Sequence, residues 1–236
     1  MSRKLKENLY RLLDRVGLAA AQVGRRSDTV KVVVVTKTVE PRIIRQLVDL
    51  GHLDLGENRV QQLTARAADL ANRKGDAELP RWHMIGHLQR NKVRSLLPWV
   101  HWLHSLDSLR LAEELNNQAA KQDQVVHAFL QVNASGEKAK SGVAVGAATH
   151  LVEQIQTLPH VRIIGLMTMA PLVDDPEQVR PYFVRTRELF EEIAGEKLAG
   201  PDFKHLSMGM SQDFEVAIQE GATVIRVGTA LFEGLR

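Results

Sequence analysis

The sequence predicts an α/β protein built as a single (β/α)8 barrel, a closed ring of parallel strands surrounded by helices. Two observations lead to this fold class. Short apolar runs of strand length alternate with segments of helical periodicity, and eight such runs occur along the chain. The length of 236 residues is also close to the ~250 residues of a typical barrel of this type. We therefore expect residues 1–236 to form one domain.

The composition is that of an ordinary globular protein, with 44% hydrophobic and 25% charged residues. This composition disfavours disorder and fibrous repeats. Cysteine is absent, which excludes disulfides, thiolate nucleophiles and cysteine-ligated metal sites. Every apolar run is shorter than the ~18 residues that a membrane span needs. The first residues also lack the apolar core of a secretory signal, so we expect a cytoplasmic protein without a membrane partner.

An extra helix is predicted before the barrel. Its apolar stripe at helical spacing consists of Leu5, Leu9, Leu12, Leu13 and Val16. Residues 1–26 also contain seven Lys or Arg and only two acidic residues. Nucleic-acid-binding surfaces interleave such charges with aromatic residues or carry them on a known module, and neither occurs here. We interpret these charges as the solvated face of the helix and expect no nucleic-acid partner.

The strands and helices of the barrel follow in strict alternation. The first strand, residues 30–35, consists largely of β-branched residues and is too apolar for an edge strand. Pro41 starts the next helix, which Gly51 ends, and Asn58 is placed to cap the helix over residues 59–73. Further strands are expected at residues 53–55, 81–85, 99–104, 125–132, 161–166, 203–206 and 223–227. Further helices are expected at about 91–97, 109–121, 146–158, 179–193 and 214–220.

Two details complete this assignment of elements. The acidic pair Asp174 and Asp175 before Pro176 is typical of the start of a helix. An open, doubly wound sheet is the alternative architecture. Its Gly-x-Gly-x-x-Gly signature is missing after the first strand, which favours the barrel.

In such a barrel the chemistry lies at the carboxyl ends of the strands. Lys37 directly follows the first strand, and we expect its amine to point into the barrel mouth above an apolar floor. Removal from water favours the neutral amine, which is a nucleophile toward aldehydes. The loops after the seventh and eighth strands offer hydroxyls, glycine and backbone N–H groups, which are suited to a phosphate. Together with Arg226, these features indicate a phosphorylated aldehyde, and pyridoxal 5′-phosphate is the ligand that we expect.

Several motifs, in order and at compatible spacing, closely resemble those of the pyridoxal phosphate homeostasis protein family. The resemblance covers residues 30–234, and the family in turn resembles the N-terminal barrel domain of alanine racemase. The motifs are Val35-Thr36-Lys37-Thr38, Gly56-Glu57-Asn58, Trp82-His83-Met84-Ile85-Gly86, Asn133-Ala134-Ser135-Gly136-Glu137, Lys140-Ser141-Gly142, Gly165-Leu166-Met167, Leu206-Ser207-Met208-Gly209-Met210-Ser211 and Arg226-Val227-Gly228-Thr229.

The resemblance implies roles for some of the matching residues. Lys37 would be the lysine that holds pyridoxal 5′-phosphate as a covalent aldimine, and Arg226 would face the pyridine nitrogen. The phosphate contacts implied are Ser211, Gly228 and Thr229. We also assign Asn58, His83 and Ser207 to the cofactor pocket.

A guanidinium facing the pyridine nitrogen disfavours protonation of that nitrogen, which makes the ring a poorer electron sink. The racemases that the family resembles carry a second domain whose tyrosine supplies the opposing acid or base. This chain ends at Arg236, soon after the eighth strand, and has only Tyr10 and Tyr182. We therefore predict a non-catalytic protein, a monomer or weak dimer, that captures the cofactor and releases or delivers it to pyridoxal-phosphate-dependent apoenzymes.

Two other functions stay open at this point. The first is a slow amino-acid racemase, or another pyridoxal phosphate enzyme, that uses Lys37 as a base. The second is a metal-dependent barrel hydrolase, because the pairs His83/His87 and His101/His104 have the spacing of helical ligands. On a strand, however, residues four apart lie ~13 Å from each other, which disfavours a shared metal.

A further hypothesis concerns the two lysines of the loop after the fifth strand, Lys138 and Lys140. An amine near the mouth could accept the aldehyde from Lys37 and help to pass it on.

Overall fold

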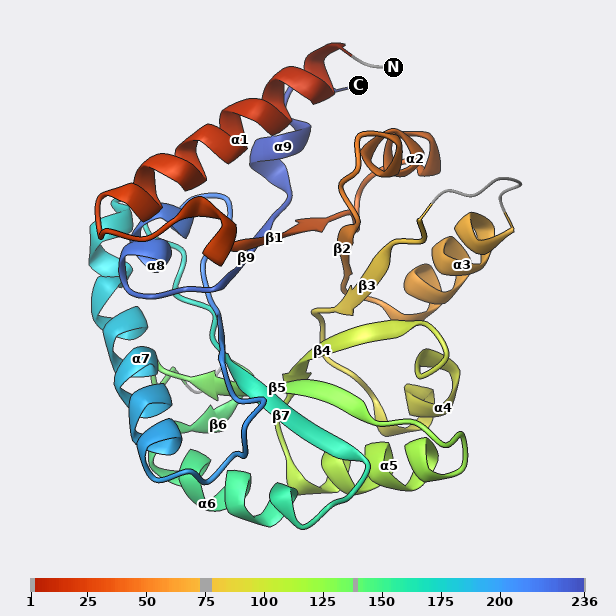
Figure 1. Cartoon of the computed structure of the whole chain (residues 1–236), viewed down its shortest axis with the longest axis vertical. Coiled ribbons are helices and arrows are strands. Elements are labelled where there is room, and N and C mark those ends of the chain that lie inside the picture. The colour runs from red at the N-terminus through yellow and green to blue at the C-terminus, as the bar shows by residue number, and fades with distance from the viewer. Residues whose placement is uncertain (1–2, 73–77, 138–139, 236) are drawn as a thin grey trace.

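The computed structural model describes residues 3–72, 78–137 and 140–235, which form a closed barrel of parallel strands with helices around it (Figure 1). Strand β1 pairs with β2 on one side and with β9 on the other, and pairing of β4 with β5 completes the ring. The predicted (β/α)8 barrel is therefore confirmed. The barrel strands are β1 (Lys31–Val35), β2 (Asp54–Glu57), β3 (Arg81–Met84), β4 (Val100–Leu106), β5 (Val126–Asn133), β7 (Val161–Met167), β8 (His205–Ser207) and β9 (Val224–Val227).

The helices lie outside the strands, as Figure 1 shows, and the described part has none long and apolar enough to cross a bilayer. The α-helices are α1 (Arg3–Ala21), α2 (Pro41–Asp49), α3 (Val60–Ala71), α4 (Val93–Leu96), α5 (Leu109–Ala120), α6 (Val145–Gln156), α7 (Arg180–Gly195), α8 (Phe214–Gln219) and α9 (Thr229–Phe232). Short 3-10 helices are η1 (Ser27–Thr29), η2 (Arg90–Lys92) and η3 (Pro176–Val179).

The structure corrects some details of the predicted elements. Asn58 does not cap α3, because the residue at the N-cap is Arg59 and its side chain makes no capping bond. The helix predicted at about residues 91–97 consists of the 3-10 turn η2 followed directly by the short α-helix α4. The two-residue strand β6 (Val143–Ala144), which pairs with the end of β5, was not predicted. The predicted start at Asp175 is confirmed, since its carboxylate accepts a hydrogen bond from the N–H of Glu177 in η3.

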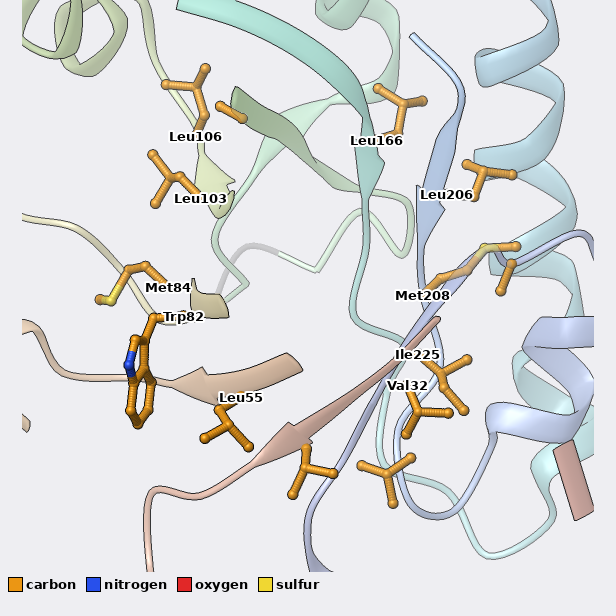
Figure 2. Packing of buried hydrophobic residues seen from close by; sticks show 14 of the residues in the cluster. Val32, Leu55, Trp82, Met84, Leu103, Leu106, Leu166, Leu206, Met208 and Ile225 are labelled. Carbon is orange, nitrogen blue, oxygen red and sulfur yellow. The ribbon is translucent and has the colours of Figure 1, made fainter. Parts of the chain in front are cut away.

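The valine-rich β1 explains how the barrel wall is packed. Successive side chains of a strand point to opposite faces, and both faces of this wall are buried. Val32 and Val34 join the large outer cluster between strands and helices. Figure 2 shows other members of this outer cluster, among them Leu55 and Leu206. Val33 joins a small inner cluster that also contains Phe129, Ile164, Met167 and Val224.

The predicted extra helix is α1, and it joins the two ends of the chain. It packs against α8 and α9, so the first and last described segments lie side by side (Figure 1). Its buried Asn8 donates hydrogen bonds to the backbone carbonyls of Leu231 and Glu233, both at 2.9 Å. Leu13, which the periodicity placed in the apolar stripe, is 40% exposed.

Candidate functional site

A cavity of about 1410 Å³ lies at the carboxyl ends of the strands, where the fold places functional sites. Six of the predicted site residues line it. These are Lys37, Asn58, Ser211, Arg226, Gly228 and Thr229. The other two, His83 and Ser207, are fully buried inside the barrel and do not line the cavity.

Lys37 lies in the turn after β1 and is exposed. Lys37 lines the cavity at the barrel mouth, and its exposed side chain is not removed from water in the protein by itself. The amine is instead accessible to a ligand that enters the cavity. Its position depends on how the turn from Thr36 to Val39 is held.

Arg66 of α3 holds this turn at both ends. Its Nη1 donates to the backbone carbonyl of Thr36 at 2.8 Å, and its Nη2 donates to that of Val39 at 2.7 Å. The guanidinium also pairs with the fully buried Glu57, whose carboxylate accepts a hydrogen bond from the Thr36 hydroxyl. Thus one cation and one buried acid fix the backbone that carries Lys37. Sequence reasoning did not find this pair, although the matching Gly56-Glu57-Asn58 motif contained its acid.

The loop after β8 and the start of α9 form a second side of the cavity. The Ser211 hydroxyl accepts hydrogen bonds from the backbone N–H groups of Gly228 and Ala230, both at 3.3 Å. Gly209 has a φ of +93°, and a Cβ there would lie 2.6 Å from that of Ala217, so this turn requires glycine. Hydroxyl and backbone N–H groups of this kind suit a phosphate.

Asp213 closes the same loop and was given no role from the sequence. It lines the cavity, and its carboxylate accepts a hydrogen bond from the backbone N–H of Met210. Burial raises the pKa of Asp213. Asp213 is recognised as a cavity residue only from the folded loop, in which it contacts Met210.

Arg226 of β9 supplies a cation at the floor of the cavity. Its Nη1 donates to the Ser207 hydroxyl at 2.6 Å, and its Nη2 donates to the backbone carbonyl of Thr168 at 2.9 Å. Burial lowers the pKa of Arg226 to about 10, against the influence of Asp213. The side chain is therefore still charged at neutral pH.

His83 and Ser207 are linked to the cavity only through other residues. The Nε2 of His83 lies 3.0 Å from Asp54, and its Nδ1 lies 3.0 Å from the Nε2 of His104. The Nδ1 of His104 lies 2.8 Å from the Ser207 hydroxyl, which contacts Arg226. His83 and Ser207 therefore lie in the layer beneath the cavity wall, and their assignment to the cofactor pocket stays a prediction.

The histidine pairs of the metal hypothesis do not form a metal site. His87 is exposed and lies 3.5 Å from Asp107, whereas His83 points inside the barrel. Across residues 3–72, 78–137 and 140–235, no three His, Asp or Glu side chains are arranged to hold a metal ion.

The loop after β5 borders the cavity through Ser141. Lys138 lies outside the described residues. Lys140 makes an ion pair with Glu137 at 3.0 Å. The proposed passage of the aldehyde to these lysines stays a prediction.

The cavity thus combines an accessible amine, a buried guanidinium and a group of hydroxyl and N–H donors. This set fits a ligand that carries an aldehyde, a ring nitrogen and an anionic group. Neither tyrosine of the chain lies in the cavity wall, because Tyr10 is on α1 and Tyr182 is on α7.

Comparisons with known proteins show which families the chain resembles. The family model described as alanine racemase, N-terminal domain, matches residues 19–235. A pyridoxal phosphate homeostasis protein from Aquifex aeolicus is 44% identical over 227 residues, which is 96% of each chain. The solved structure of an unknown protein from Bifidobacterium adolescentis is 37% identical, with a TM-score of 0.89 over 98% of this chain and 95% of that one. PipY from Synechococcus elongatus, solved with PLP bound, is 32% identical, with a TM-score of 0.80 over 93% of this chain and 99% of that one.

Proposed function

The chain belongs to the pyridoxal phosphate homeostasis protein family, and from this premise we propose that it binds pyridoxal 5′-phosphate in the cavity at the barrel mouth. It holds the cofactor on Lys37, takes part in homeostasis of the cofactor in the cytoplasm, and does not turn over amino acids. The observation that carries this proposal is the placement of Lys37 and Arg226 on one cavity together with Ser211, Gly228 and Thr229.

The bond to Lys37 forms by condensation. The neutral amine of Lys37 adds to the aldehyde carbon, and a C=N bond replaces the C=O bond. The two amine protons leave with the aldehyde oxygen as one water molecule, so the step needs no other reactant. Because water can hydrolyse the same C=N bond, the site can both take up and release the cofactor.

The other cavity residues bind and orient the ligand. Ser211 and Thr229, with the backbone N–H of Gly228, hold the phosphate, while Asn58 borders the ring. Arg226 donates toward the pyridine nitrogen and, as a buried cation, opposes protonation there. When bound, the cofactor supplies an electron sink, and an unprotonated ring makes that sink weak. This favours storage over turnover.

An amino-acid racemase, the alternative, requires a second acid or base facing Lys37. The positions of Tyr10 and Tyr182 outside the cavity wall argue against either tyrosine in this role. We therefore propose transfer of the cofactor to apoenzymes as the role of the protein, which acts as a monomer or weak dimer.

The test is the absorption spectrum of the purified protein mixed with pyridoxal 5′-phosphate, for the wild type, Lys37→Ala and Lys92→Ala. Lys92 lies in η2, outside the cavity wall, and serves as the matched control. We expect a visible band in the wild type and in Lys92→Ala, and its loss in Lys37→Ala. Borohydride reduction followed by peptide mapping should place the added mass on Lys37.

Two results would overturn the proposal. The first is an unchanged band in Lys37→Ala. The second is exchange of the α-proton of an amino acid with solvent deuterium at the rate of an enzyme, which would establish turnover. A recipient apoenzyme that gains no activity from the loaded protein would remove the delivery role alone.

A further inference from the structure

A continuous series of hydrogen-bonding contacts crosses the barrel from its bottom rim to the cavity. It starts at Asp54, the first residue of β2, and ends at Arg226 on β9. Each neighbouring pair lies between 2.6 and 3.0 Å apart. We call this series the interior relay, and it consists of Asp54, His83, His104, Ser207 and Arg226.

At the cavity end of the relay, the guanidinium favours one arrangement of the first proton. A guanidinium can donate hydrogen bonds but cannot accept them. The Ser207 oxygen therefore accepts from Arg226, and its own O–H is free to donate to the Nδ1 of His104.

The bottom end requires the same direction. Hydrogen bonds from His83 and Arg81 hold the pKa of Asp54 far below its usual value against the opposing effect of burial, so Asp54 is a carboxylate that can only accept. The Nε2 of His83 must then carry the proton. A neutral His83 has a bare Nδ1, which accepts from the Nε2–H of His104. That leaves the Nδ1 of His104 bare, so that it can accept the hydrogen bond from the Ser207 hydroxyl at the cavity end.

Both imidazoles are held neutral and fixed in orientation. Burial is the largest cause that lowers the pKa of each histidine. The groups that face His83 are Asp54, Lys31, Arg81, His101, Trp102 and His104. The ring of His104 stacks on Phe129 at 4.3 Å between centroids, and Arg226 and His205 also act on its charge. A rotated ring would lose these contacts.

We propose that His83 and His104 are positioning residues for Arg226, because the order of donors that Asp54 imposes leaves Ser207 as an oriented acceptor for the guanidinium at the cavity floor. The bottom rim of the barrel is thereby coupled to the cation that faces the ligand. The effect on bound cofactor rests on the proposed function, whereas the hydrogen bonds of the relay exist without a cofactor.

The first test needs neither a variant nor the cofactor. Nitrogen-15 NMR of the histidine side chains at neutral pH should find His83 and His104 neutral, each protonated at Nε2 and bare at Nδ1. A proton on the Nδ1 of His104, or a charged ring at either position, would overturn the relay.

The second test compares two substitutions of His104 that keep opposite halves of its contacts. In His104→Asn the amide oxygen lies near the position of Nδ1 and still accepts from Ser207. In His104→Gln the amide nitrogen lies near the position of Nε2 and donates to His83, but it does not reach Ser207. In His104→Gln we expect cofactor affinity to fall about tenfold, with a shifted absorption maximum and a shifted pH profile. In His104→Asn we expect all three properties to stay closer to those of the wild type.

Equal affinities and spectra in the two variants would sink the positioning role, provided that circular dichroism shows both to be folded. A wild type that binds no cofactor would instead refute the proposed function. In that case the NMR measurement still decides on the relay.

Discussion

Strand β2 carries one buried acid on each face of the barrel wall, and the two acids organise their surroundings differently. Asp54 points into the barrel, where His83 is its nearest link to the cavity. Glu57 faces the helices and pairs directly with Arg66 of α3. The inner acid acts at a distance through neutral imidazoles. The outer acid, Glu57, acts through one direct partner, the Arg66 cation, which holds the Lys37 turn.

This difference shows how one strand supports both basic residues of the site. The outer pair, which we call the turn clamp, consists of Glu57 and Arg66 and fixes backbone. The interior relay fixes the direction of side-chain hydrogen bonds and contains groups that gain protons in acid. We therefore expect the turn clamp to dominate stability and the interior relay to dominate pH dependence.

Arg66→Met should have the largest effect. It leaves the fully buried Glu57 carboxylate without its cation, which typically costs about 3–5 kcal/mol of unfolding free energy. Urea denaturation measures this loss. The double variant Glu57→Leu/Arg66→Met should recover much of it, because no charge then stays buried. A loss below about 1 kcal/mol in the single variant would contradict the clamp.

Asp54→Ala should cost less, about 2 kcal/mol, because it strands one buried N–H of His83 while Lys31 and Arg81 can turn to water. The same urea series measures it. Arg81→Ala is the control, since Arg81 pairs with Asp54 but lies outside the interior relay. A loss in Asp54→Ala greater than that in Arg66→Met would reverse the ranking of the two assemblies.

The pH dependence of stability separates the two assemblies further. The folded-state pKa values of His83 and His104 are lowered, so below the unfolded value of about 6.5 the unfolded chain binds more protons. The contribution of these two histidines to the free energy of unfolding is therefore fully present above about pH 6.5. It is lost as the pH falls, by about 1.4 kcal/mol per pH unit for each histidine that stays neutral in the folded chain.

Thermal or urea unfolding between pH 4.5 and 7.5 measures this slope. His104→Asn should reduce it by the share of one histidine, while Arg66→Met should leave it unchanged. If His104→Asn left the slope of unfolding free energy against pH unchanged, the His104 ring would have the same pKa in the folded and the unfolded chain.

Ser211→Ala should have the smallest effect on stability, about 1 kcal/mol, because the N–H groups of Gly228 and Ala230 are only partly buried. It touches neither assembly and so gives a reference for both. Its main effect should be weaker binding of pyridoxal 5′-phosphate with little change for pyridoxal, which lacks the phosphate. Titration with both compounds measures this, and equal weakening of the two would remove Ser211 from the phosphate contacts.

Much of the fold could be predicted from local patterns. The run of valines in β1 has no polar residue to face water, so it had to be buried on both sides, and Pro41 and Gly51 punctuate α2. Asn58 shows the limit of this reasoning. Its residue type suits a cap, but the chain turns into α3 one residue later and leaves Asn58 at the cavity.

The sequence by itself determined the order of strands and helices, and it placed Lys37, Arg226 and the Ser211 loop at strand ends, because periodicity and turn residues act over a few positions. Only the tertiary structure decided that Asp54, His83, His104 and Ser207 form one line and that Arg66 reaches the Lys37 turn. Those contacts join different strands and helices, and they depend on the register and closure of the ring, which no local pattern encodes.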